Sequence, residues 1–263
     1  MEKSEKHKHF VMLHGACHSA WCWYKVVTLL RSKGHRVTAL DMAAAGVHPK
    51  RLEELASFSD YCNPLLEFLV ALHTFNMGCY TPTVALTSDG RVILVGHSFG
   101  GLCISLAMER GDDLQILFTF FIIERKQFHK QLDYMDTQLT FGNGVDKLLT
   151  SLLLGPKFLS SQLYELSPPE DLALATLLMR PVVPYNGTQF EKQMAISKEN
   201  YGSVRRVYLI SENDNSIKQR FQNWAIENNP CDEVKMISGA DHMAMFSKPR
   251  ELCSFLQEKA EKY

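Results

Sequence analysis

The sequence predicts an α/β fold, with a mostly parallel central sheet and helices on both of its faces. Strand-like and helix-like segments alternate along the first part of the chain, and such alternation indicates parallel strands joined by crossover helices. The strand-like segments are short apolar runs of the kind that parallel sheets bury on both faces. At 263 residues the chain is long enough for one such domain, which we expect to span residues 1–263.

The first elements follow one another in a regular order. Residues 9–16 are predicted to form a strand that runs into a turn of small residues, and residues 21–35 to form a helix. Residues 36–46 supply a second strand with its loop, and residues 52–72 a second helix. The apolar run 92–95 is the third predicted strand, and a helix begins shortly after it.

The strand pattern returns after a different middle segment. Residues 116–123 are far fewer than the roughly 20 apolar residues that a membrane span needs, so this run predicts a buried strand. Residues from about 124 to 197 carry apolar repeats at helical spacing, and we expect them to form a helical cap inserted after the central strands. The sheet is expected to resume at 206–211 and 233–238, before an amphipathic helix that follows Pro249.

Composition narrows the classes of partner. The 28 basic and 29 acidic residues form no run of one sign, which disfavours nucleic acid and membranes as partners and favours a small molecule. The charged N-terminus lacks an apolar segment of the secretory type, so we expect a cytoplasmic protein. Seven cysteines without CxxC pairs or zinc spacing predict reduced thiols and no metal site. The composition does not determine the oligomeric state, and a homodimer is one of the states compatible with it.

A glycine-flanked serine lies at the junction of the third strand and its helix. The segment Gly96-His97-Ser98-Phe99-Gly100 matches the pattern G-x-S-x-G, in which a nucleophilic serine sits on a strained turn. The two glycines let strand and helix pass closely. An ordinary glycine-rich turn also fits the pattern. Because the flanking strand and helix are those that the motif requires, Ser98 is predicted to be a nucleophile exposed at the carboxyl edge of the sheet.

A serine hydroxyl needs a base within hydrogen-bond reach before it can attack a carbonyl. In the chain order serine, acid, histidine, only His242 follows the last predicted strand, in the loop where the base belongs. His97 neighbours the serine, but we expect a structural role for it. His7 and His9, near the N-terminus, are expected to be solvated.

The acid that orients the base is expected in the loop after the preceding strand. That loop offers Glu212 and Asp214, and we favour Asp214 because it lies deeper in the loop. A turn-forming or helix-capping role is the alternative for Asp214. Asp241 is a weaker candidate, because adjacent side chains in an extended loop diverge. N–H donors for an oxyanion are predicted from Phe99, after the nucleophile, and from Ala16, after the first strand.

Several long stretches together resemble the plant methylesterase family of α/β hydrolases, and the likeness covers most of the chain. The stretches are HFVMLHGACHSAWCWYK, GHRVTALDMAAAG, VILVGHSFGGL, LLGPKF, SPPEDLALATLLMRP, YGSVRRVYLIS and GADHMAM. The resemblance implies the α/β-hydrolase fold and a cofactor-free serine esterase with Ser98, Asp214 and His242 as its triad. It also implies Ala16 and Phe99 as the oxyanion donors.

The resemblance further implies a class of substrate. The family cleaves methyl esters of small plant hormones, such as methyl salicylate, methyl jasmonate and methyl indole-3-acetate. An apolar pocket under the cap is therefore expected to hold an aromatic or cyclopentyl acyl group. Its expected contacts with the ester are Ala16, Ser98, Phe99, Leu152, Leu153 and His242. Packing within the core of the cap is the alternative role for Phe99 and the leucines near 152 to 154.

The related hydroxynitrile lyases offer another chemistry on the same fold. Those enzymes carry a threonine and a lysine where this chain has Gly15 and Met243. Without a cation to take up the charge of the departing cyanide, lyase chemistry is disfavoured and ester hydrolysis is favoured.

Two departures from the family pattern bear on activity. Residues 73–91 form a longer connection than the family has, and a block of cap is missing after the apolar run 116–123. A shortened cap would open the pocket to water and slow turnover. This motivates a second hypothesis, in which the protein is catalytically weak and binds the hormone acid.

Overall fold

The computed structural model describes residues 7–76, 92–110, 116–120, 134–142, 149–185 and 187–262. Its centre is a six-stranded sheet in which every strand pairs with its neighbours in parallel. The strands run in the order β2-β1-β3-β4-β7-β8. Their bounds are β1 (His9–Leu13), β2 (Arg36–Leu40), β3 (Val92–His97), β4 (Ile116–Phe120), β7 (Arg206–Ser211) and β8 (Glu233–Ile237). The predicted parallel sheet is confirmed.

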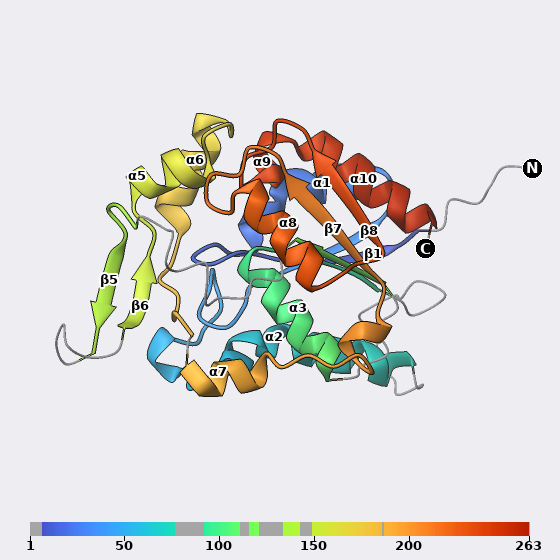
Figure 1. Cartoon of the computed structure of the whole chain (residues 1–263), viewed down its shortest axis with the longest axis horizontal. Coiled ribbons are helices and arrows are strands. Elements are labelled where there is room, and N and C mark those ends of the chain that lie inside the picture. The colour runs from blue at the N-terminus through green and yellow to red at the C-terminus, as the bar shows by residue number, and fades with distance from the viewer. Residues whose placement is uncertain are drawn as a thin grey trace, which may run out of the picture.

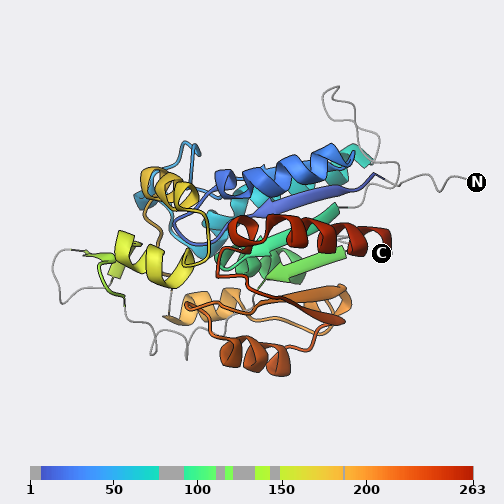
Figure 2. The ribbon, with the colours of Figure 1, turned by 90° about the horizontal axis from the view of Figure 1, so that it is seen from above.

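Helices cover both faces of this sheet, as predicted. Helices α1 and α10 lie over one face, and α2 and α3 lie over the other (Figure 1). In the view from above, α1 and α10 lie in front of the strands of the sheet (Figure 2). The helices of this body are η1 (Ala20–Trp23), α1 (Tyr24–Ser32), η2 (Leu52–Glu54), α2 (Phe58–Asn76), α3 (Phe99–Glu109), η4 (Tyr201–Ser203), α8 (Gln219–Asn228), α9 (Ala244–Ser247) and α10 (Pro249–Lys262).

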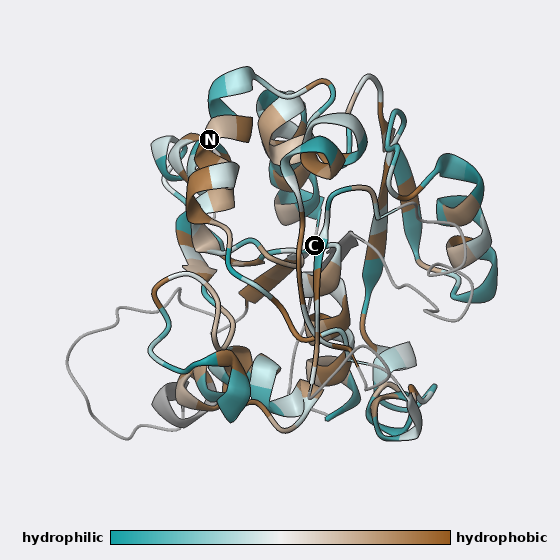
Figure 3. Ribbon diagram, turned by 90° about the vertical axis from the view of Figure 1, so that its left-hand side faces the viewer, coloured by the Kyte–Doolittle hydropathy of each residue, from teal (hydrophilic) through white to brown (hydrophobic). Residues whose placement is uncertain are grey.

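The sheet separates two apolar cores, one on each of its faces. In β1, Phe10 and Met12 pack into the core under α1 and α10, whereas Val11 and Leu13 pack into the core under α2 and α3. This alternation follows from the two-residue period of side chains along a strand. Colouring by hydropathy shows apolar residues gathered on the central strands and on the helix sides that face them (Figure 3).

The cap lies beyond one end of the sheet, on the side of the molecule away from the two chain termini (Figure 1). Its elements are β5 (Gln138–Phe141), β6 (Leu149–Leu153), α5 (Pro156–Phe158), the single wide turn η3 (Leu159–Leu163) and α6 (Pro169–Leu178). Helix α7 (Gly187–Gln193), which follows in the chain, packs beside α2. The cap contains helices, as expected, but its first described part differs from the expectation, because β5 and β6 form an antiparallel pair. The leucine run that we interpreted as helical begins as β6, where Leu152 also bridges to Val182.

The structure also tests expectations about single residues and segments. His9 is not solvated: it is 1% exposed in β1, and its Nε2 lies 2.8 Å from Oγ1 of Thr38. Burial lowers the pKa of His9 to about 4. The insertion at 73–91 falls almost wholly outside the described residues, as does the start of the shortened cap. Within the described part of the chain, no helix is long and apolar enough to cross a membrane.

Candidate active site

Ser98 sits on a turn whose backbone conformation is rare for a residue with a side chain. Its φ is 51° and its ψ is −116°, between the end of β3 and the start of α3. The glycines on either side make this turn possible. A Cβ at Gly100 would lie 2.5 Å from the carbonyl oxygen of Leu13, and a Cβ at Gly96 would lie 2.8 Å from the backbone of Gly100. Strain of this kind gathers at functional sites.

His242 and Asp214 form a buried hydrogen-bonded pair. Nδ1 of His242 lies 2.8 Å from Oδ2 of Asp214, and these residues are 4% and 3% exposed. Since a carboxylate only accepts hydrogen bonds, Nδ1 carries the proton and Nε2 is the ring nitrogen that can accept one as a base. The other carboxylate oxygen, Oδ1, accepts the N–H of Ile217 at 2.7 Å. The structure therefore selects Asp214 over Glu212 as the partner of His242.

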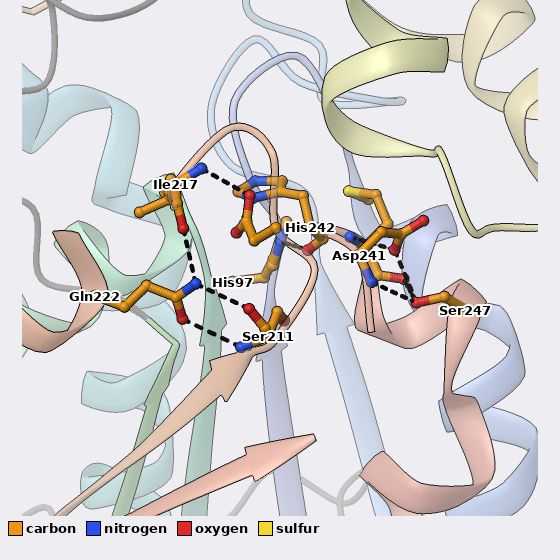
Figure 4. Close-up of polar contacts among 9 residues, drawn as sticks. His97, Ser211, Ile217, Gln222, Asp241, His242 and Ser247 are labelled. Carbon is orange, nitrogen blue, oxygen red and sulfur yellow. Dashed lines mark hydrogen bonds and ion pairs between the residues drawn. The ribbon is translucent and has the colours of Figure 1, made fainter. Parts of the chain in front are cut away.

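Gln222 of α8 braces the loop that carries the acid. Its Oε1 accepts the N–H of Ser211 at 3.1 Å, and its Nε2 donates to the carbonyl oxygens of Ser211 and Ile217 at 3.0 and 2.7 Å (Figure 4). Both ends of the loop are thus fixed to one fully buried side chain. Sequence reasoning did not find Gln222, because a glutamine in an amphipathic helix carries no signal of its own.

His97 joins the strand that carries the serine to the loop that carries the base. Its Nε2 donates to the carbonyl oxygen of His242 at 2.8 Å, and the two rings meet edge to face with centroids 4.7 Å apart. Burial lowers the pKa of His97 well below its usual value, so the ring stays neutral. The contact agrees with the structural role expected for this histidine.

Asp241 points away from the base and holds the cap to its loop. Its Oδ2 accepts the N–H of Leu166 at 3.0 Å and the hydroxyl of Ser167 at 2.8 Å. Its Oδ1 accepts the N–H of Met243 and the hydroxyl of Ser247, at 3.0 and 2.8 Å (Figure 4). Burial raises the pKa of Asp241 despite these donors. The divergence from His242 is that expected for adjacent side chains.

A pocket joins the serine, the base and the cap. It is lined by three of the predicted catalytic and oxyanion residues from the sheet side, Ala16, Ser98 and Phe99, and by His242. The cap contributes a lining that is almost wholly apolar, namely Leu152, Leu154, Phe158, Leu163, Val182, Val183 and Pro184, with Tyr134 beside them. No Asp, Glu, Lys or Arg lines the pocket among the described residues. The site can therefore present a nucleophile to an apolar, uncharged molecule.

One predicted contact residue differs. Leu152 lines the pocket, but Leu153 does not, and Leu154 lines it instead. Because Leu152 and Leu153 belong to strand β6, their side chains point to opposite sides. The helical interpretation of this segment did not provide for this alternation. Val182 and Pro184, which sequence reasoning also missed, reach the pocket through the bridge between Val182 and Leu152.

The two predicted oxyanion donors, Ala16 and Phe99, both line the pocket. Phe99 is the first residue of α3, where the N–H groups of a helix have no partner within the helix. Ala16 follows β1, and its carbonyl oxygen accepts a hydrogen bond from Nδ1 of His18 at 2.8 Å. Nε2 of His18 lies 2.7 Å from the hydroxyl of Tyr164 in the cap. Burial lowers the pKa of His18 to about 3, so its ring is neutral.

Comparison with known proteins places this site in a family. Methyl jasmonate esterase 1 of Vitis vinifera is 47% identical over 279 aligned residues, which cover 100% of both chains. Salicylic acid-binding protein 2 of Nicotiana tabacum is 40% identical, over 97% of this chain and 98% of that protein. The crystal structure of tomato methylketone synthase I complexed with 2-tridecanone matches with a TM-score of 0.86 at 40% identity, over 98% of this chain and 99% of that one. The model of the alpha/beta hydrolase family matches residues 10–255, and the chain belongs to this family.

Proposed function

We propose that the protein is a serine esterase that hydrolyses methyl esters of small plant hormone acids. The observation that carries the proposal is the hydrogen bond of buried Asp214 to His242, which lines a pocket together with the strained Ser98. The similarity to methyl jasmonate esterase 1 and to salicylic acid-binding protein 2 supports the choice of substrate class.

The proposed reaction has two stages. Nε2 of His242 takes the proton of the Ser98 hydroxyl as Oγ attacks the ester carbonyl, and the N–H groups of Ala16 and Phe99 stabilise the oxyanion. The same proton then passes to the departing methoxide, which leaves as methanol. Water attacks the acyl-enzyme along the same route and releases the carboxylic acid. Asp214 keeps the imidazole in the tautomer that each transfer requires, and the chemistry needs no cofactor.

The lining of the pocket supports an uncharged ester with an apolar acyl group. Burial of such a group against the leucines and Phe158 of the cap is favourable by about 25 cal/mol for each Å² removed from water. The product acid is charged, and its carboxylate would face a pocket without Lys or Arg among the described residues. The pocket residues that the structure describes therefore offer the carboxylate no ion pair.

The proposal is tested by release of acid from methyl jasmonate, methyl salicylate and methyl indole-3-acetate, each with purified wild-type protein and with Ser98→Ala. Ser98→Ala is expected to lower kcat by about 10⁴-fold or more. The control variant Ser160→Ala removes an exposed hydroxyl in the cap and is expected to leave kcat unchanged. Equal rates for Ser98→Ala and the wild type would contradict the proposal.

A hormone-binding protein is the second candidate, and the apolar pocket under the cap is the observation that favours it. The related tomato methylketone synthase I was crystallised with 2-tridecanone, an apolar ketone. Titration calorimetry with jasmonic, salicylic and indole-3-acetic acids separates the candidates. Binding of an acid by a protein that hydrolyses none of the three esters would support the second candidate, and serine-dependent turnover would support the first.

A further inference from the structure

The peptide bond between Gly15 and Ala16 carries one of the two proposed oxyanion donors. Because a trans peptide is planar, its N–H and its C=O point in opposite directions. The direction of the Gly15 carbonyl therefore fixes the direction of the Ala16 N–H. Gly15 allows many backbone conformations, so this peptide needs an anchor outside its own backbone.

His14 supplies such an anchor through its side chain. Its Nδ1 donates to the carbonyl oxygen of Gly15 at 2.9 Å, and the backbone N–H of His18 donates to the same oxygen at 3.2 Å. The ring of His14 is fully buried. The carbonyl of Gly15 is thus held on the side of His14 by two hydrogen bonds.

The second ring nitrogen of His14 determines which tautomer is present. Nε2 lies 3.1 Å from the backbone nitrogen of Met42, which can only donate a hydrogen bond. Nε2 must therefore be unprotonated, and Nδ1 must carry the proton that is donated to Gly15. Burial lowers the pKa of His14, which keeps the ring neutral and able to accept at Nε2.

Gly15 lies in a tightly packed position beside the nucleophile. A Cβ at Gly15 would lie 3.0 Å from Nδ1 of His97 and 3.2 Å from Cβ of Ser98. A side chain at position 15 would therefore crowd His97 and Ser98. Gly15 allows the loop to lie close to Ser98, and His14 fixes the direction of the peptide bond between Gly15 and Ala16.

We propose that His14 is a positioning residue for the oxyanion site: its Nδ1–H···O=C bond to Gly15 aims the Ala16 N–H at the reacting carbonyl. The proposal rests on the esterase function proposed above. His14 touches neither substrate nor nucleophile in this role. It acts on kcat, because the oxyanion forms only as the reaction proceeds.

Two substitutions separate the two hydrogen bonds of His14. The amide nitrogen of Asn takes the place of Nδ1, so His14→Asn keeps the donor to Gly15 and loses the acceptor for Met42. The amide oxygen of Gln takes the place of Nε2, so His14→Gln keeps the acceptor and loses the donor. Each variant loses one buried hydrogen bond, and we expect similar drops in thermal stability.

The kinetics of the two variants are expected to differ. His14→Gln is expected to lower kcat for the best methyl ester at least tenfold below that of His14→Asn, with KM within about threefold of wild type, because loss of an oxyanion donor costs about 10² to 10³ in kcat. Equal kcat values for the two variants, beside an active wild type, would overturn the role of His14 and would leave the proposed esterase function unaffected. A wild type without Ser98-dependent hydrolysis would overturn the proposed function and this role together.

The tautomer can be measured in the wild-type protein, so the proposal remains testable where a variant does not fold. Long-range ¹H–¹⁵N correlation spectra distinguish protonated from unprotonated ring nitrogens. A protonated Nδ1 with an unprotonated Nε2 in His14 is the expected result. A proton on Nε2 would overturn the proposal, because the donor to Gly15 would then be missing.

Discussion

At the scale of single residues, Asp214 and Glu212 are two acids of the same loop with different surroundings. Asp214 is buried against His242, whereas Glu212 is exposed and accepts the N–H of Gly239 at 2.8 Å. Replacing Asp214 with Asn removes the acceptor that holds Nδ1–H of His242. We expect Asp214→Asn to lower kcat for methyl ester hydrolysis by about 10⁴-fold. Glu212→Gln is the matched control, and a comparable loss there would contradict the assignment.

The triad candidates could be predicted from the sequence, because the order of serine, acid and histidine along the chain and the predicted ends of the strands are enough to identify them. Ser98, Asp214 and His242 each follow a predicted strand, so the parallel sheet brings them to one edge. Single-residue contacts were harder to predict. Whether Leu153 or Leu154 lines the pocket depends on the alternation of side chains along strand β6, and the apolar pattern of the sequence did not reveal this strand. Asp241 and His14 act through hydrogen bonds to backbone groups, which no sequence motif marks.

At the scale of elements, the contact between α3 and β1 depends on Gly100. A Cβ there would lie 2.5 Å from the carbonyl oxygen of Leu13 and 2.8 Å from that of His14, and neither backbone atom can yield. We expect Gly100→Ala to lower the free energy of unfolding by about 1 to 3 kcal/mol. Gly202→Ala, whose Cβ would meet no atom closer than 3.5 Å, is expected to change it by less than about 0.5 kcal/mol. Equal effects in urea unfolding would contradict this packing.

The cap depends on Asp241 for its attachment to the loop of His242. The carboxylate receives four hydrogen bonds, two of them from Leu166 and Ser167 in the cap. In Asp241→Asn an NH₂ group replaces one carboxylate oxygen, so a hydrogen-bond donor then faces the N–H and O–H groups that donate to that oxygen in the wild type. We expect unfolding free energy to fall by about 1 to 3 kcal/mol and KM for methyl esters to rise as the cap loosens. Unchanged KM and unchanged urea midpoint would show that the contact does not hold the cap.

The helical interpretation of the cap failed for a physical reason. Residues 149–154 are dominated by leucines, which suit a helix as well as a strand, so the apolar pattern alone does not decide between them. The antiparallel partner β5 decides it, and that pairing is a contact between separate segments. The strands of the main sheet were easier to predict, because each is bounded by polar or glycine-rich segments.

At the scale of the whole molecule, buried neutral histidines tie stability to pH. Burial lowers the pKa of His18 to about 3 and also lowers those of His14 and His97. The unfolded chain takes up protons below pH 6.5 while these folded rings stay neutral, so stability falls as pH decreases from 6.5 towards 3. At pH 5 His18 alone costs about 2 kcal/mol. Asp241, with its raised pKa, acts in the opposite direction.

Urea unfolding at pH 7 and pH 5 measures this effect on the free energy of unfolding. We expect the lower value at pH 5, and we expect His18→Gln to reduce the difference between the two pH values. A free energy of unfolding that rises on acidification would show that the histidines are not neutral in the folded protein.

The central claim for the whole molecule is that its fold activates one serine, Ser98. The most direct test is labelling with a fluorophosphonate, followed by mass spectrometry of the peptide that contains the modified residue. The account predicts one adduct, on Ser98, that forms much faster in the wild type than in Asp214→Asn. An adduct on another serine, or equal rates in the two proteins, would contradict it.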